Sequence, residues 1–370
     1  MDTIEQVEAA FETHLEAGLH HGAQLAVYHE GDLVLDLAGG TTGPDGEETT
    51  SDRKHVLFSC TKPYAGVALH RCVEGGLLSY DDPVVEHWPE FASGGEKSEI
   101  TVRQVLSHQA GLHETAFDTE FERWSDWEAA VEAMEAAETT FSPGETAAYH
   151  SLSYGFLVGE LVRRASGTPV EEFLDERVFA PLGMADTDLG IPEGEPDTTA
   201  SLAGFAPGER ARETDAGLDA FSNAEAAALF GEEWLHRAVV PAASATGTAR
   251  DMARFYSCLA KGGELDGTRV LAEETVQEMA TEQVAVERDD TLGVPRRYGL
   301  GVVLGGTPWN KFGTISPGRV FGHGGLGSIV GWADPEADLA FSYVTNGIRE
   351  ETEHALRVNA LSDAVRIAFA

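Results

Sequence analysis

Strand-like sequence stands at both ends of this 370-residue chain, and a long, mostly helix-like stretch separates the two ends. Near the start, the apolar runs Gln24–Tyr28 and Leu33–Leu37 flank a polar turn, a pattern typical of a β-hairpin. After about residue 296 the pattern again indicates strands, at Tyr298–Leu304, Arg319–Gly322, Ser328–Ala333 and Leu339–Thr345. Because strands that are distant in sequence can pair in space, we expect both ends of the chain to share one antiparallel sheet.

Helices are expected at both termini and throughout the intervening stretch. The first begins at Thr3, where Gln6 completes a capping-box pattern, and the last spans residues 352–368. The clearest internal helices are expected at Trp127–Ala137, Ser153–Ala165 and Arg250–Lys261. The expected fold class is therefore α+β, an antiparallel sheet flanked by terminal helices with an inserted, mostly helical domain. The predicted sheet domain comprises residues 1–75 and 264–370, and the predicted helical domain comprises residues 76–263.

Acidic residues outnumber basic residues along the whole chain. Asp and Glu number 63 against 25 Lys and Arg, which gives a formal net charge of −38, and only five of the basic residues are lysines. Repulsion among these charges would strain a compact state in dilute buffer, whereas about 1 M salt screens charges beyond about 3 Å. We therefore expect a protein of a salt-rich cytosol. The same charge disfavours binding to nucleic acid or to an anionic membrane, because both require clusters of Lys and Arg.

Several other classes of protein are disfavoured by what the sequence lacks. No run approaches about 18 apolar residues, so a membrane-spanning helix is excluded. The first residues have neither the basic nor the apolar region of a secretory signal, so the expected location is the cytoplasm. Cys60, Cys72 and Cys258 are too few for a disulfide framework and lack metal-like spacing, and the histidines show no zinc pattern either. We expect a small-molecule substrate and neither a metal nor a cofactor, and the sequence favours no particular oligomeric state.

The strongest candidate for a reactive group is Ser59, which forms the pattern Ser-x-x-Lys with Lys62. Ser51 and Lys54 form the same pattern, but that segment is wholly polar and is expected to be a solvated turn. Ser59 instead follows an apolar run and precedes a helix-like stretch. Because proline is tolerated only near a helix start, Pro63 indicates a helix that begins at or just before Ser59.

A helix start would assist chemistry at Ser59 in two ways. Positions i and i+3 lie on one face of a helix, so the Lys62 amine can reach the Ser59 hydroxyl. The backbone N–H of Ser59 is unpaired at a helix start and can donate to an oxyanion. Lysine acts as a base only where burial or a cationic neighbour lowers its pKa from about 10.4. The alternative is that Ser59 merely caps the helix and that Lys62 lies on the surface.

Two further segments favour the chemical interpretation. Tyr149 lies on a predicted loop at the entrance of the helix Ser153–Ala165. Residues 321–327 are rich in glycine and lie between two predicted strands, where small residues let a ligand approach the backbone closely. Both segments are distant from Ser59 in sequence, so only folding could bring them to it.

With these segments the chain resembles the serine β-lactamase-related family, which includes class C β-lactamases, D-alanyl-D-alanine carboxypeptidases and carboxylesterases of the same fold. The resemblance covers nearly the whole chain, and the matching stretches follow the family's order: Ser59–Lys62, Leu106–Leu112, Tyr149–Ser151, Pro181–Met184, Thr246–Phe255, Phe321–Gly327 and Gly331–Glu336. It implies a two-part fold with the site at the junction. It also implies that Ser59 is acylated, that Lys62 and Tyr149 exchange its proton, and that the N–H groups of Ser59 and Leu326 form the oxyanion hole.

Two positions depart from the family's usual motifs. The second motif often reads Tyr-x-Asn, but here Ser151 replaces the amide with a shorter hydroxyl. The third motif often begins with lysine, but here it begins with His323, followed by Gly324 and Gly325. We assign these four residues to substrate binding. Because a free imidazole with a pKa of about 6.5 is mostly uncharged at neutral pH, His323 would hold a substrate carboxylate poorly.

Both departures resemble the esterase branch of the family. The predicted function is therefore a serine hydrolase that acts through an acyl-enzyme, as a carboxylesterase on neutral esters. A β-lactamase or D-amino-acid peptidase with the same Ser59, Lys62 and Tyr149 machinery is the first alternative. A catalytically silent binding protein of the same fold is the second.

Overall fold

The computed structural model describes residues 3–92, 95–208, 222–307 and 309–369. Its centre is an eight-stranded sheet in which all neighbouring strands are antiparallel. In spatial order the strands are β2 (Asp32–Gly40), β1 (Gly22–His29), β14 (Leu339–Thr345), β13 (Ile329–Asp334), β12 (Phe321–Gly325), β11 (Val303–Leu304), β10 (Arg296–Tyr298) and β9 (Val284–Val286).

The two ends of the chain meet in this sheet. The N-terminal strand β1 pairs with the C-terminal strand β14, with Leu25 opposite Tyr343, which confirms the expectation of one shared antiparallel sheet. Successive side chains of a strand point to opposite faces. On β1, Leu25 and Val27 therefore join the apolar layer on one face, whereas Ala26 and Tyr28 join the layer on the other. Both faces of the sheet are thus buried.

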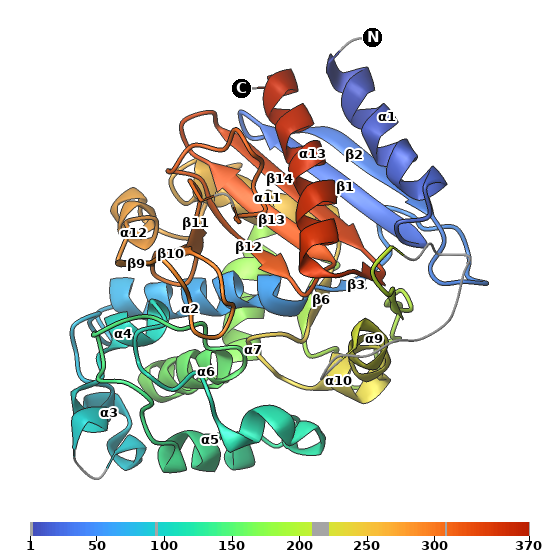
Figure 1. The fold of residues 1–370 in the computed structure, drawn as a ribbon. Helices are drawn as coiled ribbons and strands as arrows, with labels where there is room; N and C mark the ends of the chain where they lie inside the picture. The colour runs from blue at the N-terminus through green and yellow to red at the C-terminus, as the bar shows by residue number, and fades with distance from the viewer. Residues whose placement is uncertain (1–2, 93–94, 209–221, 308, 370) are drawn as a thin grey trace.

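The terminal helices cover one face of the sheet. α1 (Thr3–Glu16) and α13 (Glu351–Phe369) lie side by side there, with both chain ends on the same side of the molecule (Figure 1). Val7 and Phe11 of α1 pack with Leu361 of α13 in the apolar layer beneath them, because apolar residues recur at the helical period. The predicted sheet flanked by terminal helices is confirmed.

The opposite face of the sheet is covered by α11 (Ala249–Ala260), which packs against β1, β13 and β14 (Figure 1). Gly331 on β13 makes this close approach possible, because the Tyr256 ring of α11 occupies the space that a side chain at position 331 would need. By sequence, α11 falls within the range 76–263 of the predicted helical domain, yet it packs on the sheet. The division of the chain into two domains at these boundaries remains a prediction.

The other helices form a layered region on the α11 side of the sheet (Figure 1). α2 (Lys62–Glu74) is buried along almost all of its length and packs against α6 (Ser153–Ser166), which ends at Gly167 with a left-handed φ of 76°. Around them lie α3 (Val84–His87), α4 (Val102–Leu106), α5 (Trp127–Ala136), α7 (Val170–Leu174), α8 (Ala180–Leu182), α9 (Asn223–Phe230), α10 (Glu233–Arg237) and α12 (Glu273–Met279). Short strands complete the chain: β3 (His55–Val56), β4 (Asp188–Leu189), β5 (Ala203–Gly204), β6 (Ala245–Gly247), β7 (Glu264–Leu265), β8 (Thr268–Arg269) and β15 (Gly347–Ile348).

One predicted strand is wrong. The segment Tyr298–Leu304 is not continuous, because a tight turn divides it between β10 and β11. The N–H of Gly299 donates to the carbonyl of Val302, and Gly301 has a φ of 83°, a conformation that favours glycine. Within the described parts of the chain, no helix combines the length and the apolar character needed to cross a membrane.

Candidate active site

Ser59 lies in a constrained turn that leads into α2. The 3₁₀ turn Phe58–Thr61 continues directly into the helix, and Phe58 has a φ of 45°, which is rare for a residue other than glycine. Two contacts hold this conformation. The buried Phe58 ring packs against Phe230 with centroids 5.0 Å apart, and the Thr61 hydroxyl donates to the Phe58 carbonyl at 2.6 Å. The turn leaves the Ser59 side chain half-exposed at the wall of a pocket.

Lys62 is buried directly behind Ser59. Its Nζ donates to the Ser59 Oγ at 3.3 Å, as the i, i+3 spacing predicts, and to the carbonyls of Ser151 at 2.7 Å and Ala242 at 3.1 Å. Only 1% of the residue is exposed, and this burial is the main cause that lowers its pKa from the ordinary 10.5 to about 7. An unprotonated amine is therefore accessible near neutral pH.

Tyr149 brings a phenol to the same point from a distant loop. Burial raises the pKa of Tyr149 above its ordinary value, and a hydrogen bond with Ser59 acts in the opposite direction. The Lys62 Nζ lies 4.7 Å from the centroid of the Tyr149 ring. The structure thus brings together the hydroxyl, amine and phenol that sequence analysis singled out.

Two buried side chains hold the loop that carries Tyr149. The Tyr149 N–H donates to Oδ1 of Asp289 at 3.1 Å, and the N–H of the next residue, His150, donates to Nδ1 of His108 at 3.1 Å. The second oxygen of Asp289 accepts from the Tyr298 hydroxyl at 2.6 Å. The contacts of His108 and Asp289 with this loop could not be predicted, because neither residue lies near Tyr149 in the sequence.

The glycine-rich segment at the end of β12 lies against the Ser59 turn. A side chain at Gly325 would stand 2.8 Å from the Leu57 carbonyl oxygen and 3.1 Å from the Phe58 Cβ. Gly325 is not among the residues that line the pocket, and its lack of a side chain permits this close approach, so its contact with substrate remains a prediction. Leu326 follows it and lines the same pocket as Ser59. Among the described backbone hydrogen bonds, neither the Ser59 N–H nor the Leu326 N–H has a protein acceptor.

Residues of α13, and of the segment that leads into it, hold the backbone at Gly327. The carbonyl of Gly327 accepts from the Arg357 guanidinium at 2.8 Å and from the Arg349 N–H at 2.9 Å, and the N–H of Gly327 donates to Glu351 at 3.2 Å. Arg357 is only 3% exposed. This role of Arg357 was not predicted, because the residue belongs to a helix that was expected only to cover the sheet.

His323 lines the pocket as a neutral imidazole. Its Nδ1–H donates to the Gly324 carbonyl at 2.7 Å, and its ring lies 5.9 Å from that of Tyr149. Burial first, and the charge of Lys62 second, lower the pKa of His323 to about 3. Its Nε2 is buried and has no partner among the described residues. The uncharged state agrees with the expectation from sequence, and Nε2 is a hydrogen-bond acceptor.

The pocket in front of Ser59 has a volume of about 810 Å³ and mostly apolar walls. Ser151 and Gly324 line it, together with a larger apolar set: Phe58, Phe121, Trp124, Leu152, Phe230, Leu292, Val294, Val303, Trp309, Phe312 and Leu326. Two cations that sequence analysis missed also line it. Lys311 is paired with Glu351 at 2.5 Å, whereas Arg296 donates to backbone carbonyls and forms no ion pair among the described residues.

Lys54, from the competing Ser-x-x-Lys pattern, is paired with Asp188 at 2.5 Å. Among the described residues, no group of three or more His, Cys, Asp or Glu side chains is arranged to hold a metal ion. The three cysteines are free and buried.

Comparisons with known proteins match nearly the whole chain. The profile of the family described as Beta-lactamase matches residues 7–365. The chain is 34% identical to the Esterase/beta-lactamase LipL of Mycobacterium tuberculosis over 351 residues. This alignment covers 90% of this chain and 80% of that protein. The crystal structure of a family VIII carboxylesterase has a TM-score of 0.84 at 27% identity and covers 98% of this chain and 97% of that chain. A penicillin-binding protein homolog from Caulobacter crescentus has a TM-score of 0.84 at 31% identity and covers 98% of each chain.

Proposed function

The chain belongs to the beta-lactamase family and is a serine hydrolase of the β-lactamase and esterase type, and from this premise we propose that it is a carboxylesterase acting through an acyl-enzyme on Ser59. One observation carries the proposal. A buried lysine whose pKa is lowered to about 7 lies 3.3 Å from the hydroxyl of a serine that faces a pocket. An amine with a pKa near the working pH is suited to remove and return a proton.

In the proposed reaction, the Ser59 oxygen attacks the ester carbonyl carbon and its proton passes to the unprotonated amine of Lys62. The carbonyl oxygen becomes an oxyanion, which the N–H groups of Ser59 and Leu326 would bind. When the intermediate collapses, the alcohol leaves with a proton that returns from Lys62 through the hydroxyl of Tyr149. Water then attacks the acyl carbonyl carbon and gives a proton to Lys62. The bond between that carbon and the Ser59 oxygen breaks, the proton returns from Lys62 to this oxygen, and the carboxylic acid leaves.

The two proton carriers have different roles in this scheme. Burial raises the pKa of Tyr149, so the phenol keeps its proton and can only relay one. Burial lowers the pKa of Lys62, so the amine can act as the base. His108 and Asp289 would act as positioning residues, because they hold the backbone on either side of the Tyr149 ring.

The pocket supports esters with apolar acyl or alcohol groups. Aromatic side chains of Phe121, Trp124 and Phe230 line the pocket that Ser59 faces and would bury such a group. The neutral His323 offers a substrate no positive charge, unlike the lysine often found at this motif position.

Arg296 supports a second candidate function. It lines the pocket, forms no ion pair among the described residues, and its charge acts on both Tyr149 and His323. A cation at this position could hold the anionic group of a β-lactam or of a peptide terminus. Small-molecule amides therefore remain the alternative substrates.

The decisive experiment measures hydrolysis of p-nitrophenyl butyrate in molar salt. Ser59→Ala should abolish turnover, and Lys62→Ala or Tyr149→Phe should reduce kcat/KM by orders of magnitude. Ser51→Ala, from the competing pattern, is the matched control and should retain full activity. Unchanged turnover in Ser59→Ala would eliminate the proposal, and failure of wild type to react with a fluorophosphonate probe would instead support a silent binding protein.

A parallel assay separates the two candidate substrate classes. Wild type should hydrolyse the neutral ester far more efficiently than nitrocefin, and comparable efficiency on nitrocefin would overturn the ester preference. Arg296→Gln should leave neutral-ester turnover nearly unchanged. A marked loss of nitrocefin turnover in that variant would support the second candidate.

A further inference from the structure

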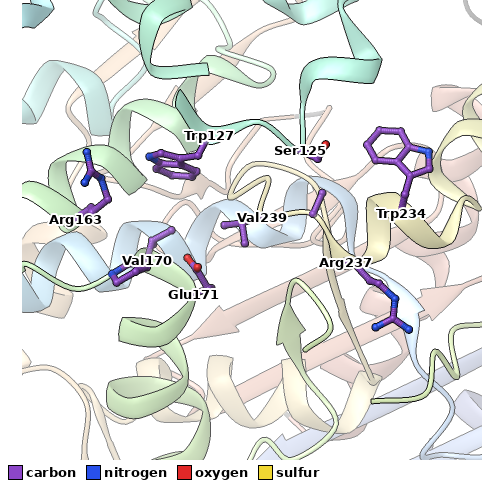
Figure 2. Close-up of a pocket in the computed structure, with 10 residues that line it drawn as sticks. Ser125, Trp127, Arg163, Val170, Glu171, Trp234, Arg237 and Val239 are labelled. Carbon is purple, nitrogen blue, oxygen red and sulfur yellow. The ribbon is translucent and has the colours of Figure 1, made fainter. Parts of the chain in front are cut away.

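A second cavity, of about 540 Å³, lies outside the catalytic pocket, and none of the residues that line it lines the catalytic one. It lies among α5, α7 and α10 and the segment that follows α10 (Figure 2). Its walls are Ser125, Trp127, Arg163, Pro169, Val170, Glu171, Trp234, Arg237, Ala238 and Val239. The proposed esterase mechanism uses none of these side chains.

Two indoles, those of Trp127 and Trp234, form part of the cavity wall. Figure 2 shows Trp127 and Trp234 on either side of Val239, with the Glu171 carboxylate below Trp127 in this view. The Trp127 ring is fixed in place, because its N–H donates to the buried Glu160 at 2.9 Å. A ligand in this cavity would therefore contact preformed aromatic surfaces.

The two arginines of the cavity have carboxylate partners, whereas its one carboxylate has no ion-pair partner among the described residues. Arg163 donates to Glu160 at 2.7 Å, and Arg237 donates to Glu233 at 2.7 Å, so both cations already have carboxylate partners. Glu171 is half-buried and forms no ion pair among the described residues. Burial, and less strongly the charge of neighbouring Glu172, raise the pKa of Glu171. The uncompensated charge in the cavity is therefore negative.

We propose that this cavity binds a small organic ammonium ion with an apolar body, whose cation contacts Glu171 and an indole face while the body packs among Trp127, Trp234 and Val239. Indole faces attract cations, and desolvation strengthens that attraction. The net charge of −38 also raises the local concentration of cations around the whole protein. Anionic ligands would face Glu171 without a free arginine to bind them.

The cavity shares two stretches of chain with the catalytic pocket. Trp124 lines the catalytic pocket, and the next residue, Ser125, lines this cavity. The wall residue Val239 lies three residues before Ala242, whose carbonyl accepts from Lys62 at 3.1 Å. We expect a bound ammonium ion to change the rate of ester hydrolysis through this segment, an effect that rests on the proposed function.

The binding test is a calorimetric titration of wild type with phenethylammonium chloride at constant salt concentration. Wild type should bind the probe, and Glu171→Gln should bind it about tenfold more weakly or not at all. Glu172→Gln is the matched control, because Glu172 is exposed, neighbours Glu171 on α7 and does not line the cavity. This control should bind the probe as wild type does.

Neutral and anionic analogues separate charge recognition from apolar packing. 2-Phenylethanol and phenylacetate should both bind about tenfold more weakly than phenethylammonium. Any one of four results would overturn the proposal: no binding of phenethylammonium, equal binding of all three probes, tighter binding of phenylacetate, or equal affinity of Glu171→Gln and wild type for phenethylammonium.

The effect on ester hydrolysis is measured separately, at a saturating concentration of the probe. An unchanged rate despite binding would refute only the coupling, and an inactive enzyme that still binds the probe would refute only the esterase.

Discussion

Replacing Lys62 with methionine should stabilise the protein while destroying its activity. In the folded protein the Lys62 ammonium is buried, whereas in the unfolded chain it is hydrated. A lysine whose pKa falls from 10.5 to about 7 carries a penalty of about 5 kcal/mol when it is protonated in the fold, because each pKa unit corresponds to about 1.4 kcal/mol. Methionine has a similar length and no charge to bury.

The gain should be smaller than that penalty. The Ser151 and Ala242 carbonyls would lose their donor, which costs about 1–3 kcal/mol. We therefore expect Lys62→Met to raise the free energy of unfolding by about 2 kcal/mol or more at a pH of about 6.

The pH dependence makes this prediction specific to Lys62. Between the folded pKa of about 7 and the ordinary value of 10.5, the unfolded chain binds more protons than the folded protein. Wild-type stability should therefore rise with pH in this window, by about 2.5 kcal/mol between about pH 6 and about pH 9 from this residue alone. The stabilising effect of Lys62→Met should shrink by the same amount over that interval.

The assay is guanidinium unfolding followed by circular dichroism at both pH values. Lys261→Met, which removes a surface lysine paired with Asp338, controls for the loss of one positive charge. If the stability of Lys62→Met and of wild type changed equally with pH, the reasoning would be refuted.

In wild type, kcat/KM should rise with pH through about 7, because only the unprotonated amine can accept the Ser59 proton.

Three further predictions follow from other parts of the structure. Asp289→Ala should lower kcat and destabilise the protein by about 3 kcal/mol, because the Tyr149 N–H and the Tyr298 hydroxyl lose their acceptor; unchanged kcat and melting temperature would contradict this. Gly331→Ala should destabilise the protein by about 1–3 kcal/mol in denaturant unfolding, because the new methyl group would overlap the Tyr256 ring. If the variant were as stable as wild type, α11 would have to shift without cost, which contradicts this prediction. Raising KCl from about 0.1 M to about 2 M should raise the melting temperature, since screening relieves the repulsion of a −38 chain; equal or greater stability in low salt would count against a salt-rich origin.

Local patterns predicted most of the elements and part of the site. β14 matches its predicted bounds, and the i, i+3 spacing of Ser59 and Lys62 was sufficient to place the amine at the hydroxyl. The segment Tyr298–Leu304 was mispredicted, because an apolar run contains no clear signal that its glycines turn the chain. The substrate contact of Gly325 remains a prediction, and the close approach of its backbone to the Ser59 turn was not foreseen, because it depends on tertiary packing.

The sequence by itself determined the α+β class, the antiparallel sheet shared by both ends of the chain, and the position of Ser59 at a helix start, because each follows from the periodicity or spacing of neighbouring residues. Only the tertiary structure decided that Lys62 is dry enough to lose its proton near neutral pH, that Asp289 and His108 hold the Tyr149 loop, and that Arg296 lines the pocket. The reason is that burial sets the pKa of a side chain and that contacts between distant segments set its hydrogen-bond partners. Neither burial nor such contacts can be read from the residues adjacent in the chain.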